Sequence, residues 1–287
     1  MENLLSLAFD NLSSYDGAKI RKGLRQVEGL LANMCLSRPQ SGSGNGNSSD
    51  SGGSRERCAL VSRGRGGGEE SSSSSSALPT SKSLSELADD PAFHEFFKLQ
   101  EGFEWNVAVR IVNTLDRLLA KGSDGSNDLL ILSALDLLQG LMLLHPPSKA
   151  LFSREMHMNL LLDLIEPDFC PAIQSATLLT LVTALIETPQ NARTFENLDG
   201  LLAVTSLFRS RGTSRDVKLK LIEFIYFYLM PETPNSGARP PRSSSPADGS
   251  TTRTLEEKQA LLGRHLNSVE DLVKDIKRHT LFGGVVS

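Results

Sequence analysis

The chain has 287 residues, a formal net charge of −4 at pH 7 and 6% aromatic residues. This acidic balance and low aromatic content argue against a protein that mainly binds nucleic acid or an anionic membrane surface. Cys35, Cys58 and Cys170 form no CxxC pair and have no histidine at zinc spacing, so we expect reduced thiols, no metal and no cofactor.

Residues 1–37 predict a pair of amphipathic helices that packs on the rest of the protein. Residues 2–13 place apolar side chains at helical spacing, and a second helix over 16–36 has an apolar stripe that includes Ile20, Leu24 and Val27. The opposite face of the second helix carries Lys19, Arg21, Lys22, Arg25 and Glu28.

Two tracts are predicted to be disordered. Residues 38–83 hold 24 Ser or Gly among 46 positions, and residues 232–253 hold 11 Pro, Ser or Gly among 22. Such segments cannot bury enough apolar surface to offset their chain entropy. The second tract contains Thr233-Pro234 and Ser245-Pro246, which suit proline-directed kinases, so we predict phosphorylation at Thr233 and Ser245.

Residues 84–231 are predicted to be helical throughout, with no credible strand. Asp90-Pro91 begins a first helix, because proline is favoured in the first helical turn. Turns rich in proline and glycine then separate helices at about 104–120, 128–144, 154–165, 172–187, 197–209 and 214–230. A capping-box pattern at Thr254-Leu-Glu-Glu257 predicts a C-terminal helix in the segment 254–281, followed by a tail at 282–287.

The apolar positions repeat at an offset of 43 residues. This offset aligns Pro146 with Pro189 and Phe152 with Phe195. A period of 40–47 residues, with a helix pair and a short leading helix in each unit, is typical of armadillo and HEAT repeats. The sequence therefore predicts an all-α protein, a short armadillo/HEAT-like α-solenoid with two disordered inserts.

Motifs for catalysis are absent. The chain has no P-loop, no GxGxxG placed after a strand and no GxSxG elbow. A cysteine phosphatase needs an arginine six positions after its cysteine, and those positions hold Ser41, Gly64 and Ala176. No apolar run reaches the length of a membrane span, and the N-terminus lacks a basic signal region. We expect a non-enzymatic protein without membrane insertion, in the cytoplasm or nucleus.

One polar line could form the wall of a binding groove. Asn106, Arg110, Asn113 and Arg117 recur at helical spacing opposite the apolar stripe of their helix. A solvated face explains the same pattern, whereas solenoids also bind partners along extended concave surfaces. Asp136 with Gln139, and Lys220 with Glu223, could extend this surface. Trp105, the only tryptophan, is either a core residue or a half-exposed binding anchor.

Four stretches resemble the fungal cell division control protein family of the septation initiation network. They are residues 19–32 (KIRKGLRQVEGLLA), 99–119 (LQEGFEWNVAVRIVNTLDRLL), 218–231 (KLKLIEFIYFYLMP) and 262–273 (LGRHLNSVEDLV). The resemblance spans the ordered length of the chain, and none of the stretches is a catalytic motif.

This resemblance implies a subunit that binds and activates a germinal-centre-type Ser/Thr protein kinase, as a heterodimer, to promote septum formation and cytokinesis. It also implies recruitment from the cytoplasm to spindle pole bodies in mitosis. The alternative is a generic α-solenoid scaffold for another signalling partner, such as a small GTPase or a Mob-type coactivator. Neither the kinase-binding subunit nor the generic scaffold requires nucleic acid as a partner.

Overall fold

The computed structural model of the chain describes residues 1–36, 81–122, 125–232 and 252–267. Within these residues the regular elements are all helices, and the one β-type contact is an isolated bridge between Leu36 and Ser81. The predicted all-α class is confirmed. Most of the two tracts predicted to be disordered, and everything after residue 267, lie outside the described residues.

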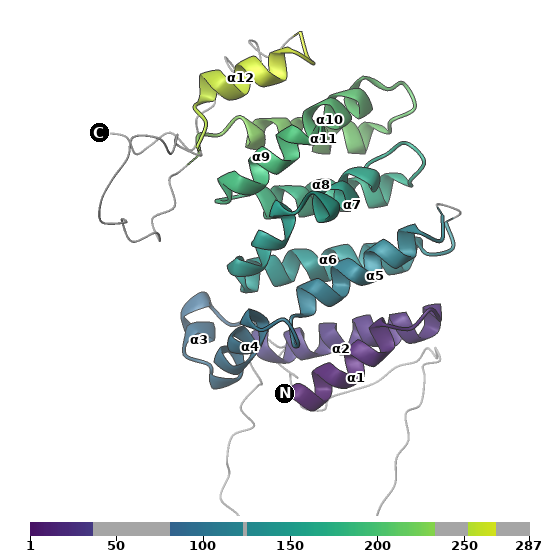
Figure 1. Cartoon of the computed structure of the whole chain (residues 1–287), viewed down its shortest axis with the longest axis vertical. Helices are drawn as coiled ribbons and strands as arrows, with labels where there is room; N and C mark the ends of the chain where they lie inside the picture. Colours follow the sequence, from purple (N-terminus) through teal and green to yellow (C-terminus); the bar gives the residue numbers. More distant parts are fainter. Residues whose placement is uncertain (37–80, 123–124, 233–251, 268–287) are drawn as a thin grey trace, which may run out of the picture.

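α1 (Glu2–Leu12) and α2 (Gly17–Cys35) form a helical hairpin at one end of the molecule (Figure 1). Asp16 caps α2, because its carboxylate accepts a hydrogen bond from a backbone N–H of the first turn at 2.9 Å. The two helices approach closely at Gly23, where a Cβ atom would lie 2.9 Å from the backbone nitrogen of Leu12.

α3 (Leu84–Ala88) and α4 (Pro91–Glu101) lie beside this hairpin (Figure 1). Asp90 caps α4 and also pairs with Lys82, which precedes α3. The N-terminal ammonium lies 3.3 Å from the carboxylate of Glu95, so an ion pair ties the start of α1 to α4.

α5 (Val107–Leu119) and α6 (Asp128–Leu144) form the next helix pair of the stack. α5 begins three residues later than predicted because Asn106 is its N-cap: the side-chain oxygen accepts from the N–H of Val109 at 2.9 Å. α6 carries seven buried residues and almost no charge, as expected for a helix covered by neighbours on several sides.

Two further repeats follow, each with a short leading helix and a helix pair. They are η1 (Pro146–Ser153), α7 (Glu155–Asp163) and α8 (Pro171–Leu185), then α9 (Pro189–Asn197), α10 (Gly200–Arg209) and α11 (Arg215–Tyr228). Pro146 and Pro189 begin the leading helices, and Phe152 and Phe195 are both fully buried. The predicted offset of 43 residues thus corresponds to real structural repeats.

Buried hydrogen bonds join the two repeats. The Asn191 amide donates to the carbonyl oxygens of Lys149 at 2.8 Å and Ala184 at 2.7 Å. These bonds fix α9 against η1 and the end of α8. The helix expected from residue 197 begins instead at Gly200. Asp199 has a φ of 57°, and this left-handed backbone conformation separates α9 from α10.

The helices form two layers (Figure 1). In one layer, which we call the ladder, α2, α6, α8 and α11 pack against each other in that order. The second layer contains α1, α5, α7, α9 and α10, and the buried apolar side chains fill the space between the layers. α12 (Leu255–Gly263) covers the far end of the stack. The predicted C-terminal helix is therefore present as far as Gly263, and its proposed extension lies outside the described residues.

Candidate functional site

The ladder helices carry stripes of exposed side chains, spaced three or four residues apart on α2 and α6 and recurring after two or three helical turns on α8 and α11. We call the four stripes together the ladder face. It comprises Arg21, Arg25 and Glu28 of α2, Leu129, Ser133 and Asp136 of α6, Leu179 of α8 with Ile186 just after that helix, and Leu219 of α11 with Met230 just after that helix. Its α2 end is charged, and its α8 and α11 stripes carry large apolar side chains that are 40–56% exposed.

Between α2 and α6 the ladder face contains a hollow of about 440 Å³, which we call the α2–α6 groove. Buried Leu24 and Leu130 form its floor, and Leu129 stands at its rim with 71% of its surface exposed. Apolar surface of this kind is available to a partner.

The charges along the α2–α6 groove are separated by sign. Arg21 and Arg25 lie toward the start of α2, and Glu28 lies further along the same helix, opposite Asp136 of α6. Partial desolvation by the neighbouring groove residues raises the pKa of Asp136, and the negative charge of Glu28 raises it further. Among the described residues, none of these four side chains forms an ion pair.

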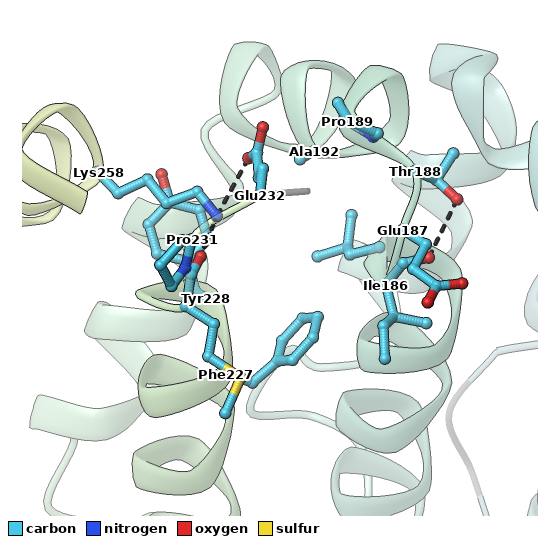
Figure 2. Close-up of a pocket in the computed structure, with 12 residues that line it drawn as sticks. Ile186, Glu187, Thr188, Pro189, Ala192, Phe227, Tyr228, Pro231, Glu232 and Lys258 are labelled. Atoms are coloured by element: carbon cyan, nitrogen blue, oxygen red, sulfur yellow. Dashed lines mark hydrogen bonds and ion pairs between the residues drawn. The ribbon is translucent and has the colours of Figure 1, made fainter. Parts of the chain in front are cut away.

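A second hollow, of about 240 Å³, lies where α8 and α11 end, beside α12 (Figure 2). Ile186, Pro189, Phe227 and Pro231 give it a mostly apolar lining. The ammonium of Lys258 lies 3.1 Å from the carboxylate of Glu232 at one side. This hollow is small, and it continues the apolar end of the ladder face.

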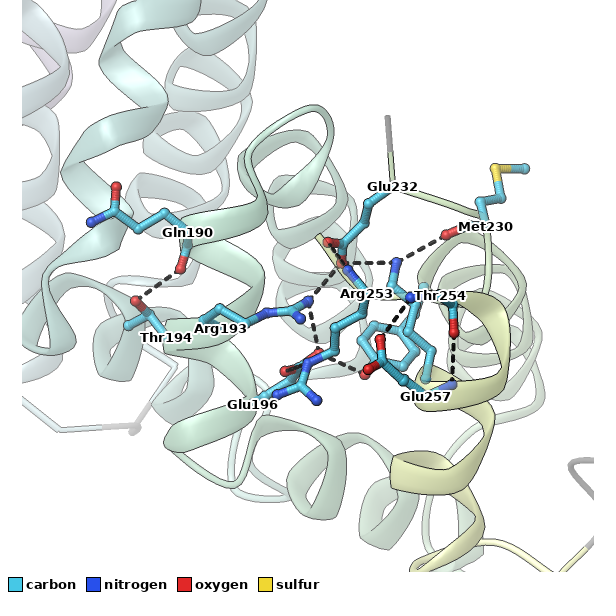
Figure 3. Close-up of polar contacts among 11 residues, drawn as sticks. Gln190, Arg193, Thr194, Glu196, Met230, Glu232, Arg253, Thr254 and Glu257 are labelled. Carbon is cyan, nitrogen blue, oxygen red and sulfur yellow. Dashed lines mark hydrogen bonds and ion pairs between the residues drawn. The ribbon is translucent and has the colours of Figure 1, made fainter. Parts of the chain in front are cut away.

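An ionic cluster joins α9, the end of α11 and α12, and we call it the clasp (Figure 3). Glu232 pairs with Arg193 at 2.6 Å and with Lys258 at 3.1 Å, while Glu196 pairs with Arg193 at 3.1 Å and with Arg253 at 2.9 Å. Burial lowers the pKa of Lys258, whereas its hydrogen bond to Glu232 raises it.

The Tyr228 hydroxyl completes the clasp by donating to Glu196 at 2.8 Å. Burial raises the pKa of this phenol, and the negative charge of Glu196 adds to the effect. The tyrosine is therefore a neutral donor. Because every charge of the clasp faces an opposite charge, we interpret the cluster as structural.

The two predicted arginines of α5 contact the N-terminal hairpin. The Arg110 guanidinium lies 5.2 Å from the centre of the Phe9 ring. Arg117 donates to the carbonyl oxygens of Ser13, at 2.8 Å, and Leu12. Both side chains therefore stabilise the packing of α5 on α1, in the layer opposite the ladder. A role for them in partner binding stays a prediction.

The other predicted residues near α5 have different surroundings. Asn106 caps the helix, and its amide donates to the carbonyl of Gln100 at 2.6 Å. Trp105 is half-buried, with its ring stacked on Phe9 at a centroid distance of 6.2 Å. Asn113 is exposed. The four predicted side chains do lie along one stripe of α5, but three of them, Asn106, Arg110 and Arg117, make contacts within the fold.

The remaining predicted residues lie on the ladder. Asp136 is exposed in the α2–α6 groove, and Gln139 is half-buried on the next turn of α6. Lys220 and Glu223 are exposed on α11 and pair with each other at 2.8 Å. The α5 residues and these four do not share one surface, because α5 belongs to the second layer.

The predicted phosphorylation sites Thr233 and Ser245 lie outside the described residues. Arg21, Arg25 and Glu28 were visible in the sequence as a polar stripe, but nothing in their spacing marked them as part of a groove. Their partner helix begins more than a hundred residues later, and only the fold brings the two together.

In the described part of the chain, no group of three or more His, Cys, Asp or Glu side chains could hold a metal ion. His145 is buried at the end of α6, where its Nδ1 lies 2.8 Å from the Ser148 hydroxyl. Burial lowers the pKa of His145, which favours the neutral form of the ring.

No single helix within 1–36, 81–122, 125–232 and 252–267 is both long and apolar enough for a membrane span. α6 and η1 meet the criterion together, but the chain bends by 118° between them.

Stacked helix pairs with a ladder on one side define a helical-repeat protein of the α-solenoid class. Residues 1–282 match the family described as Cell division control protein 14, SIN component. The protein named Cell division control protein 14 in Schizosaccharomyces pombe is 32% identical over 196 residues, which cover 66% of this chain and 78% of that protein. The chain therefore belongs to the Cell division control protein 14 family of the septation initiation network, and the resemblance stated from the sequence is confirmed. No solved structure matches the chain.

Membership of this family gives the chain a role in septation initiation, and hence in cell division.

Proposed function

We propose that the chain is a non-catalytic subunit that binds a germinal-centre-type Ser/Thr protein kinase and raises its activity during septation. The observation that carries this proposal is the ladder face. Leu179 of α8 and Leu219 of α11 are exposed at 46% and 56%. Both lie on the ladder face, and their two helices pack directly against each other. Exposed apolar side chains aligned over several helices are typical of a protein–protein interface.

The mechanism follows from binding alone. A partner that binds only the active arrangement of a kinase shifts the kinase population toward that arrangement, by as much as its difference in affinity for the two states. The α-solenoid then acts as a rigid template that orders a segment of the kinase outside its catalytic domain. We expect one copy of each protein in the complex, formed in the cytoplasm and recruited to spindle pole bodies in mitosis.

The test is co-purification of the full-length chain with the germinal-centre-type kinase of the same organism, followed by a kinase assay. We expect a complex with the mass of a heterodimer and a fall in kinase activity when the chain is removed. The substitutions Leu179→Asp and Leu219→Asp should weaken the complex, because each places a charge in the apolar part of the ladder face.

Leu202→Asp is the matched control, since Leu202 is exposed to a similar degree on α10, in the second layer. Absence of binding between the wild-type chain and the kinase at micromolar concentration would contradict the proposal. Equal effects of the ladder and control substitutions would place the interface elsewhere on the molecule.

A further inference from the structure

The α2–α6 groove has an arrangement of charges that defines what it can bind. α2 and α6 run in the same direction, because Gly17 at the start of α2 lies next to Leu130 at the start of α6, and Glu28 acts electrostatically on Asp136 further along. One end of the groove is therefore close to the beginning of both helices.

That end is positive. Arg21 lies in the second turn of α2 and Arg25 one turn later, and both are exposed side chains that line the groove. The opposite end is negative, since Glu28 and Asp136 face each other there. Glu28 lies seven positions after Arg21, which corresponds to about 10 Å along the helix axis.

Among the residues that the structure describes, the charges of the groove have no ion-pair partner. Elsewhere on the molecule close opposite charges do pair: Lys220 with Glu223, and the five charged residues of the clasp. In the groove, Arg25 and Glu28 are three residues apart on one helix and still form no ion pair among the described residues. Their side chains are therefore free to pair with a partner.

We propose that the α2–α6 groove binds a segment of the partner kinase that presents an acidic, an apolar and a basic side chain in that order over about 10 Å. The acidic side chain pairs with Arg21 and Arg25, the apolar one covers Leu129, and the basic one lies between Glu28 and Asp136. This inference rests on the proposed function for the identity of the partner, but not for the chemistry of the groove.

The negative end distinguishes a polypeptide from other ligands. A nucleic acid or an anionic lipid surface would bring phosphates along the whole groove and would be repelled by Glu28 and Asp136. A basic side chain placed between these two carboxylates removes their mutual repulsion and lowers the pKa of Asp136 on binding. A peptide can supply both charges and the apolar contact.

Two charge-reversal variants of the full-length chain test the groove. In Arg21→Glu/Arg25→Glu the positive end becomes negative, and in Glu28→Arg/Asp136→Arg the negative end becomes positive. We expect each to weaken binding to the germinal-centre-type kinase by roughly tenfold or more, and to reduce the salt dependence of binding. Circular dichroism and thermal unfolding check that the variants remain folded.

Matched controls change the net charge equally at exposed sites away from the groove. They are Arg209→Glu/Arg211→Glu and Glu104→Arg/Asp116→Arg. We expect both to bind within about twofold of wild type, because charges beyond a Debye length are largely screened. If the groove variants bind like these controls while the wild-type chain binds the kinase, the groove assignment is wrong and the proposed function stands.

Crosslinking identifies the occupant independently of affinity. A photoreactive amino acid replaces Leu129 in the groove or, as a control, Leu202 on α10. Crosslinking is carried out in cells in mitosis, and mass spectrometry identifies the crosslinked peptides. A peptide with acidic, apolar and basic residues in the stated order, obtained from position 129 alone, supports the proposal. If the wild-type chain does not bind the kinase, such a peptide from another protein keeps the groove assignment and removes only the proposed partner.

Other results would overturn the inference. Crosslinks from position 129 to residues 37–80 of the same chain would show that its own insert fills the groove. Crosslinks to a second copy of the chain, with a doubled mass in light scattering, would make the groove a dimer contact. Recovery of no peptide from position 129 would mean that nothing binds there.

Discussion

At the scale of single residues, the hairpin of α1 and α2 depends on the missing side chain of Gly23. A Cβ atom at this position would lie 2.9 Å from both the Cγ and the backbone nitrogen of Leu12. The backbone atom cannot move without shifting α1. Gly29, two turns further along the same helix, has no atom within 4 Å of the corresponding position.

We therefore expect Gly23→Ala to destabilise the protein by about 1–3 kcal/mol, because α1 must move away from α2. Gly29→Ala should instead stabilise it by about 0.5–1 kcal/mol, since alanine restricts the unfolded chain and favours the helix. Urea unfolding followed by circular dichroism measures both. Equal effects of the two substitutions would mean that helix propensity, and not the close contact, determines the outcome.

At the scale of elements, the clasp attaches α12 to the end of the stack. The side chain of Glu232 is 10% exposed and lies within ion-pairing distance of Arg193 and Lys258. Removing one partner of a buried ion pair is costly, because the remaining charge stays buried without compensation. Without the carboxylate of Glu232, the ammonium of Lys258, whose side chain is 6% exposed, would be a buried charge without an ion-pair partner among the described residues.

We expect Glu232→Gln to cost about 3 kcal/mol, the lower end of the range for a broken buried pair, because Arg193 keeps Glu196. Hydrogen exchange should show the loss mainly in α12 and the end of α11. The control is Glu223→Gln in the exposed pair with Lys220, which should cost less than about 0.5 kcal/mol. If Glu232→Gln costs as little as the control, the ion pairs of the clasp do not hold α12, and its apolar contacts alone attach it.

The sequence predicted the helices well because their signals are local. Asp16, Ser214 and Thr254 were each followed by a helix that they cap, and the apolar spacing identified the buried faces. No residue range was predicted for α9, and the helix expected from residue 197 begins at Gly200 because Asp199 interrupts the helical backbone. Nothing in the residue type requires that conformation.

The candidate site could not be predicted in the same way. α2 and α5 both carry a polar stripe opposite an apolar one, and periodicity does not show which stripe another helix will cover. The carbonyl groups that bind Arg117 come from residues about a hundred positions earlier in the chain. The α2–α6 groove likewise depends on a contact between distant segments, so Asp136 was the one groove residue predicted from the sequence to bind a partner.

At the scale of the whole molecule, the stack is built from contacts between neighbouring helices. α8 packs against α6, α11, α9 and η1, whereas α12 lies at one end and is held through the clasp and a few buried leucines. In such a stack, stability is approximately the sum of the terms for each repeat and for each contact with its neighbours. The position of a substitution should then determine how far its effect spreads.

Leu181 of α8 and Leu262 of α12 allow this to be tested with the same chemistry, since both are fully buried. Leu181→Ala leaves a cavity in the middle of the ladder and should lower the free energy of global unfolding by about 2–5 kcal/mol. Leu262→Ala should release α12 while the rest of the stack unfolds at nearly the wild-type denaturant concentration. Denaturant unfolding combined with hydrogen exchange by mass spectrometry resolves the two cases, and a global loss from Leu262→Ala equal to that from Leu181→Ala would mean that the chain folds as one cooperative unit up to α12.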